Sequence, residues 1–123
     1  MSTYASPQAY REAAVLTASP EQLVVMLYDG VARFLRQAEL ALEEGQLVQM
    51  NQRIGRAEAI IDELHATLNK DAGEISERLE AIYVFCRKLL VEARIERDGH
   101  KIREVIRLFA PLREAWATIA GEA

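Results

Sequence analysis

The side chains best suited to metal binding or acid–base chemistry are the two histidines, His65 and His100. Asp62 lies three residues before His65, which is the spacing of half of a carboxylate-bridged di-metal site in a helical bundle. The other half needs a second acid three residues before a histidine, but Arg97 holds that position relative to His100. We therefore expect no metal site and no cofactor, and a solvated helix surface at Asp62 and His65.

Cys86 is the only cysteine, so no disulfide can form within the chain and a reducing compartment is favoured. It lies in an apolar seam, where a buried, inert thiol is much commoner than a nucleophile. The sequence contains no glycine-rich phosphate-binding loop. We expect no catalytic residues and no enzymatic activity.

The formal net charge is -4, which disfavours nucleic acid as the main partner. One region is locally basic, but four acids interrupt it, several at a spacing of four residues. This pattern is typical of a salt-bridged solvent face, and the alternative is an electrostatic docking patch for a protein. The basic residues are Arg87, Lys88, Arg94, Arg97, Lys101, Arg103 and Arg107, and the acids are Glu92, Glu96, Asp98 and Glu104.

The longest apolar runs, residues 23–28 and 81–86, are far shorter than the roughly 20 residues of a membrane span. The N-terminus has no basic cluster followed by an apolar segment, as a secretory signal would. We expect a cytoplasmic protein without membrane insertion. Half of the residues are hydrophobic and 28% are charged, a balance typical of one globular domain.

Four helices are predicted from apolar spacing and from capping residues. The first covers 20–44, because Ser19, Pro20 and Gln22 form a capping box and Gly45 supplies a stop. The second covers 46–69. The third carries the seam from 75 to 93, starts at an Asp71–Glu74 capping pair and ends near residue 97. The fourth carries the seam from 102 to 119 and ends near residue 121.

Pro111 conflicts with the fourth helix, because an interior proline removes a backbone hydrogen bond. We expect a kink there, or a break that restarts the helix at Leu112. Short connections make sequential helices antiparallel. The predicted fold is all-α: an antiparallel up-down-up-down four-helix bundle of residues 19–123, preceded by an N-terminal arm of residues 1–18.

The first and third helices carry more apolar residues than a bundle seam needs. The additional residues are Val24, Val25, Tyr28, Val31 and Leu35 in the first helix, and Tyr83, Val84, Phe85, Leu90 and Val91 in the third. A thick core is one explanation. The other is a set of grooves that accept apolar helices of a partner, or through which the bundle self-associates.

The arm is too apolar for a disordered tail without contacts, and it is too short to form a hydrophobic core of its own. Tyr10, Ala13, Ala14 and Leu16 are placed so that a short amphipathic turn could lie along the bundle. We expect Tyr10 and Leu16 to form a cap, either permanently docked or displaced when a partner binds.

Several segments together resemble the FliS family of flagellin-specific export chaperones, over about residues 4–119. The most specific pattern is A-S-P-x-x-L-x-x-M-L-Y-D-G at residues 18–30. Others are residues 9–10, 56–57, 60–64, 73–75, 82–85, 104–105 and 112–116. Two positions depart from the family pattern: Arg94 stands where the family usually has asparagine, and Phe85 where it commonly has a second tyrosine.

The resemblance implies a chaperone that binds the disordered C-terminal segment of flagellin as short helices and extended stretches. It also implies that binding blocks premature polymerisation and that the pair is delivered to the flagellar type III export gate. Other flagellar regulators are further candidate partners. We predict that the grooves include Val24, Leu27, Tyr28, Ile61, Leu64, Leu68 and Tyr83, and that Asp29 fixes the register of a helix or of the partner.

Overall fold

The computed structural model describes residues 6–121, which form helices and short turns without a strand. The helices are α1 (Pro7–Thr17), α2 (Pro20–Glu43), α3 (Leu47–Ala66), the 3-10 turn η1 (Lys70–Ala72), α4 (Glu74–Glu96) and α5 (Gly99–Ile119). The predicted all-helical class is confirmed. Residues 1–5 of the predicted arm and 122–123 of the predicted bundle lie outside the described residues.

The capping box predicted at the start of α2 is present. The Ser19 hydroxyl accepts a hydrogen bond from the Gln22 amide at 3.1 Å, and the Gln22 side chain accepts one from the Ser19 amide at 2.8 Å. Two backbone donors that the helix start leaves open are thereby satisfied. At the other end, Gly45 adopts a φ of 71°, a left-handed conformation that glycine takes without strain.

The start of α4 differs from the prediction. Gly73, not Asp71, occupies the N-cap position, and no side chain caps the helix there. Asn69 instead caps the η1 turn by accepting a hydrogen bond from the Asp71 amide. The predicted Asp71–Glu74 capping pair is therefore wrong, because the chain makes a separate 3-10 turn after α3 ends at Ala66.

Pro111 lies inside an unbroken α5, so the predicted restart at Leu112 is wrong. The alternative expectation, a kink within one helix, is compatible with this continuous helix. Pro111 is exposed, which keeps its ring out of the core. The carbonyl that the missing amide leaves without a helical partner is one turn earlier, at Arg107.

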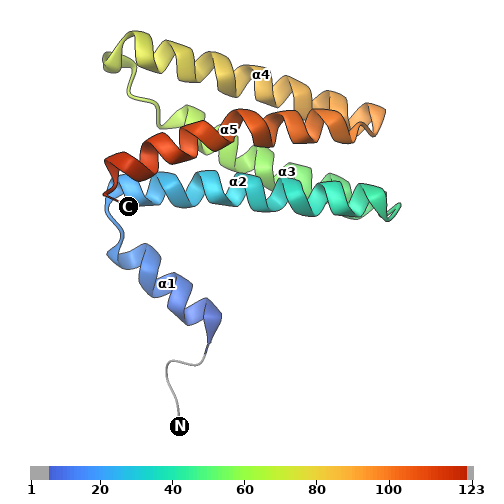
Figure 1. Cartoon of the computed structure of the whole chain (residues 1–123), viewed down its shortest axis with the longest axis horizontal. Helices are drawn as coiled ribbons and strands as arrows, with labels where there is room; N and C mark the ends of the chain where they lie inside the picture. The colour runs from blue at the N-terminus through green and yellow to red at the C-terminus, as the bar shows by residue number, and fades with distance from the viewer. Residues whose placement is uncertain (1–5, 122–123) are drawn as a thin grey trace.

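The four long helices pack side by side, with α2 and α4 each contacting both α3 and α5. In Figure 1, α4 and α2 lie on opposite sides of the assembly. The core is built from all four. Its largest fully buried side chains are Tyr28, Leu35, Met50, Ile54, Ile61, Tyr83, Leu90, Ile102 and Phe109. Cys86 is also buried, as its place in the seam predicts.

The helix α1 stands apart from this core. It has no buried residue, and Figure 1 shows it projecting from the end at which α2 begins. Ala18 and Ser19 are extended and separate the two helices. Tyr10 is 77% exposed and Leu16 is 85% exposed. In this structure the two residues do not lie against the bundle, because the extended linker directs α1 away from it, and the cap stays a prediction.

Candidate partner-binding site

The predicted groove residues fall on the early part of α2, the late part of α3 and the middle of α4, except Leu68, which lies in the connection after α3. Val24, Leu27 and Leu68 are half-buried and Asp29 is exposed. Tyr28, Ile61, Leu64 and Tyr83 are buried in the core. The placement of these four in a surface groove is therefore corrected: they lie beneath the surface.

Tyr28 and Tyr83 join α2 to α4 through the centre of the assembly. Their hydroxyl oxygens are 2.5 Å apart, and both rings pack near Phe109 of α5, at centroid distances of 5.3 and 6.1 Å. Burial raises the pKa of both hydroxyls. At Tyr28 the hydrogen bonds with Tyr83 and, to a smaller extent, with Trp116 partly oppose this effect on the pKa. Both tyrosines therefore remain neutral at ordinary pH and hold three helices in one register.

A cavity of about 220 Å³ lies above these rings, between α2 and α5. Tyr28 and Phe109 form part of its wall. At its rim the Arg113 Nε donates to Asp29 at 2.9 Å, which ties α5 to α2. The expected role of Asp29 in setting the register of a helix or of the partner stays a prediction. The cavity can accept a small apolar side chain, and the rim offers charges for a polar one.

On another side of this helix, the first two turns of α2 carry an apolar strip, made of Leu23, Val24, Met26 and Leu27. Leu23 and Met26 are each 37% exposed, whereas Val24 and Leu27 are half-buried. No helix of the described residues covers the outer side of this strip, because α1 is turned away. We call it the α2 strip. Its partly exposed apolar side chains suit contact with an apolar peptide.

The opposite side of the same end has two polar hollows, of about 230 and 370 Å³, between α3 and α4. Lys70 and Glu80 line both. The His65 Nε2 lies 2.9 Å from Glu80, and this hydrogen bond lowers the pKa of the Glu80 carboxyl. Among residues 6–121 no group of three His, Cys, Asp or Glu side chains is placed to hold a metal. His65 thus serves as an interhelix contact.

Comparison with known proteins identifies the family. The family model described as "Flagellar protein FliS" matches residues 2–123. The chain belongs to the FliS family. It is 38% identical over 114 residues to the flagellar secretion chaperone FliS of Salmonella typhimurium, covering 91% of this chain and 84% of that one. With the Bacillus subtilis protein of the same name it shares 36% identity over 108 residues, covering 88% and 80%.

The FliS relatives are named as chaperones, which suggests a non-enzymatic protein with a role in flagellar export. The match to the Vibrio cholerae FliS, 30% identical, extends over 95% of this chain and 90% of that one. The resemblance inferred from the sequence motifs is therefore confirmed. No described helix has the length and apolar character needed to cross a membrane.

One of the two departures from the FliS pattern has a structural partner. Arg94 of α4 pairs with Glu58 of α3, which also receives a hydrogen bond from Arg87 at 2.5 Å. Glu58 is only 8% exposed, so two arginines neutralise one nearly buried carboxylate. Glu58 could not be singled out from the sequence, because its partners Arg87 and Arg94 lie on another helix. Phe85, the second departure, is 48% exposed and makes the surface of α4 apolar.

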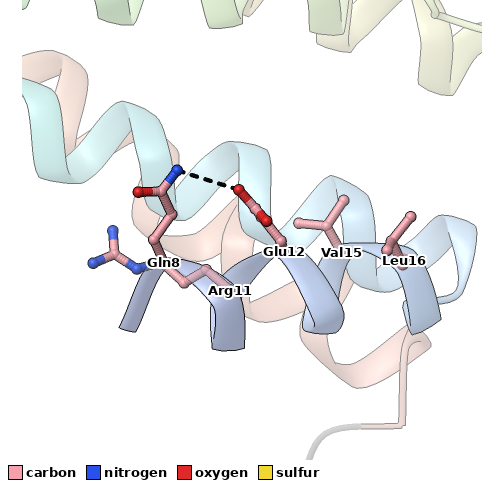
Figure 2. Close-up of a pocket in the computed structure, with 5 residues that line it drawn as sticks. All are labelled: Gln8, Arg11, Glu12, Val15 and Leu16. Carbon is pink, nitrogen blue, oxygen red and sulfur yellow. Dashed lines mark hydrogen bonds between the residues drawn. The ribbon is translucent and has the colours of Figure 1, made fainter. Parts of the chain in front are cut away.

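Beside α1 lies a hollow of about 480 Å³, lined by Gln8, Arg11, Glu12, Val15 and Leu16. Figure 2 shows these side chains along one side of the helix, with Gln8 donating to Glu12 at 3.2 Å. Val15 is 50% exposed. The α1 helix of this FliS-family chain thus presents apolar side chains that no described residue covers.

Proposed function

We propose that this chain is an export chaperone that binds the disordered C-terminal segment of flagellin in the cytoplasm. Bound flagellin would be unable to polymerise and would be handed to the type III export apparatus through an export gate component. Membership of a family whose relatives are named flagellar secretion chaperones supports this role. The observation that carries it is the partly exposed apolar α2 strip.

The proposed frame is an antiparallel up-down-up-down bundle of α2 to α5, in which each helix supports its neighbours. A rigid frame suits the binding of a disordered segment, because only the segment then loses conformational entropy. Such a segment buries roughly 1,000–3,000 Å² on binding. The α2 strip alone is too small, so the segment would have to extend over several surfaces.

Each predicted groove residue then has a distinct proposed role. Val24, Leu27 and Leu68 are accessible enough to contact the segment directly. The buried Tyr28 and Tyr83, with Ile61 and Leu64, would keep the underlying helices in place. The Asp29–Arg113 pair at the cavity rim would orient a polar group of the segment.

The arm is proposed to act as a movable cap. The extended linker at Ala18 and Ser19 can change direction, and α1 carries the exposed Tyr10, Val15 and Leu16. An apolar helix of this kind could cover the α2 strip when no partner is bound. Flagellin would then displace it. Other flagellar regulators could use the same uncovered residues.

Titration calorimetry with a synthetic peptide of the C-terminal forty or so residues of the flagellin from the same organism tests the proposal. We expect saturable one-to-one binding with a negative heat-capacity change, since apolar surface is buried. Leu27→Glu should weaken binding, and Leu40→Glu, which is exposed on the same helix outside the strip, should not. Absence of binding at high peptide concentration would overturn the proposal.

The alternative function, a bundle that self-associates through its apolar faces, predicts a different result. The exposed Val84, Phe85 and Ile95 of α4 favour it. Analytical ultracentrifugation would then show concentration-dependent dimers of the free chain, with no effect of the peptide. A monomer that binds peptide excludes this alternative.

A further inference from the structure

The outer face of α2 carries a pattern of charge towards its C-terminal end. Arg33 and Arg36 come first, Leu40 follows one turn later, and Glu43 and Glu44 stand where the helix ends. All five are exposed, and at 100° per residue their side chains fall within about a third of the helix circumference. We call these five residues the α2 end face.

The two arginines of the α2 end face have no carboxylate of their own. Glu39, one turn after Arg36, is bound by an arginine of α5, and so is Asp29, one turn before Arg33. Arg33 lies over the ring of its neighbour Phe34, 5.2 Å from the ring centroid. Among residues 6–121 neither arginine forms an ion pair, so both positive charges are available to another chain.

The two acids of the α2 end face stand where the helix itself disfavours them. The partial negative charge at a helix C-terminus attracts cations and repels carboxylates. The last turn of α2 nevertheless contains no basic residue, and within the described part of the chain neither Glu43 nor Glu44 forms an ion pair. A cation from another chain would offset this repulsion.

A hollow of about 250 Å³ lies beside Leu40, at the junction of α2 and α3. On the α2 side its wall is formed by Gln37, Leu40, Ala41 and Glu44, at positions i, i+3, i+4 and i+7. Four residues of one helix form the hole that receives an apolar side chain of another helix in knobs-into-holes packing. Arg53 of α3 lines the opposite wall. The hollow thus suits an apolar side chain on a helix that also carries a carboxylate.

The α2 end face of a second copy meets both requirements. When two α2 helices cross antiparallel with Leu40 opposite Leu40, each leucine lies at the hollow of the other copy. Arg36 of each copy then lies opposite Glu44 of the other, because these residues are four positions before and four positions after Leu40. The favourable contact occurs twice, as a two-fold interface requires.

We propose that two copies of the chain associate through the α2 end face, with Leu40 in the hollow of the other copy and Arg36 paired with Glu44. The overlap of residues 36–44 is only about 13 Å long at 1.5 Å per residue, so the interface is small. We expect a weak dimer, with a dissociation constant on the order of 100 µM.

The dimer leaves the other end of each α2 uncovered. Figure 1 shows α1 leaving α2 at its N-terminal end, and the α2 strip belongs to the first two turns of the same helix. The inference therefore does not rest on the proposed function, and each copy in the dimer keeps its own α2 strip available to a peptide.

Sedimentation equilibrium of the full chain, from about 10 to 500 µM, tests the interface, because dimer formation depends on concentration. Leu40→Glu should raise the dissociation constant about tenfold or more, since two carboxylates would meet at the centre of the contact. Ile95→Glu is the matched control, because Ile95 is 75% exposed on α4, and it should leave the constant unchanged. Circular dichroism would verify that both variants fold.

A charge exchange tests the pairing. Arg36→Glu and Glu44→Arg each bring like charges together and should separately weaken the dimer about tenfold. An equal mixture of the two variants should form a heterodimer, because opposite charges then meet at both contacts. The double variant should regain the homodimer for the same reason. Failure of both combinations to restore association would overturn the contact between Arg36 and Glu44.

The interface and the chaperone role fail in distinguishable ways. A wild-type chain that stays monomeric over the whole concentration range would overturn the interface, even if it binds the flagellin peptide. Dimers that Ile95→Glu disrupts and Leu40→Glu does not would also overturn it and would place the contact on α4. Dimers that bind no flagellin peptide would overturn the chaperone role alone.

Discussion

Two tyrosine hydroxyls meet in the middle of this helical assembly, and their mutual hydrogen bond decides whether they can be buried there. A buried polar group without a partner costs about 1–3 kcal/mol, whereas a satisfied pair costs little. Tyr28 and Tyr83 satisfy each other at 2.5 Å, and Phe109 fills the space beside them.

Removing the second hydroxyl should therefore destabilise the protein less than removing the first. We expect Tyr83→Phe to lower the free energy of unfolding by about 1 kcal/mol, because Tyr28 loses a partner. The double variant Tyr28→Phe/Tyr83→Phe should be less destabilised than the sum of the single ones. Urea denaturation of the four proteins measures this, with Tyr10→Phe as an exposed control. Strictly additive losses would contradict the coupling.

Cys86 gives the clearest dependence on pH. Burial raises the pKa of its thiol to about 12, against about 8.5 in an unfolded chain. The pKa of the thiol is thus higher in the folded state than in the unfolded state. The stability that the protonated thiol contributes is therefore complete below the unfolded-state pKa, and it is lost as the pH rises towards the folded-state pKa.

Between pH 8.5 and 10 the free energy of unfolding should fall by about 2 kcal/mol for this reason. Denaturation curves at a series of pH values measure it, and Cys86→Ala should show a shallower decline over the same range. Equal declines in both proteins would contradict the role of the thiol. Cys86 should also resist labelling reagents in the folded protein at pH 8.

At the scale of the helix, two serines occupy equivalent N-cap positions in different surroundings. Ser19 begins α2, which contributes seven residues to the buried set, and Ser6 begins α1, which contributes none. Ser19→Ala should cost about 1 kcal/mol of unfolding free energy. Ser6→Ala should cost nothing measurable, because α1 can lose helicity without unfolding the core. Equal losses would show that α1 belongs to the cooperative unit.

Between helices, the Glu58 carboxylate links α3 to α4 through Arg87 and Arg94. Each arginine keeps about a third of its side chain exposed. Solvent therefore screens the attraction between the charges in the outer part of this network, so the ion pairs should contribute little to the free energy of unfolding. The network joins the facing sides of α3 and α4 at two points along α4.

At the scale of the whole molecule, the arm and the core are separable. Removing residues 1–17 should leave the thermal midpoint within about 2 °C of the full chain, because none of the described arm residues is buried. Thermal denaturation followed by circular dichroism checks this. A loss of several degrees would show that α1 packs against the bundle in solution.

The same deletion distinguishes the two roles of the arm in binding. Calorimetry with the flagellin peptide should show tighter binding without residues 1–17 if the arm competes for the α2 strip. Weaker binding would show that the arm instead contributes contacts to the partner.

The sequence by itself determined the approximate positions of the four long helices, α2 to α5, but not the helix α1 of the arm. Caps such as the Ser19–Gln22 box and glycines such as Gly45 act within a few residues, and apolar seams report one face of each helix. The family also followed from local motifs, of which residues 18–30 were the most specific. These signals are readable because each depends only on neighbours along the chain.

Only the tertiary structure decided what covers each face. A periodic pattern identifies an apolar side of a helix but not whether another helix lies against it, so Tyr28 and Tyr83 could not be told apart from surface residues such as Val24. Ion pairs between helices could not be predicted from the sequence either, because Glu58 pairs with arginines that lie 29 and 36 residues away along the chain. The direction of α1 depends on two extended linker residues, Ala18 and Ser19, whose dihedral angles no seam or cap prescribes.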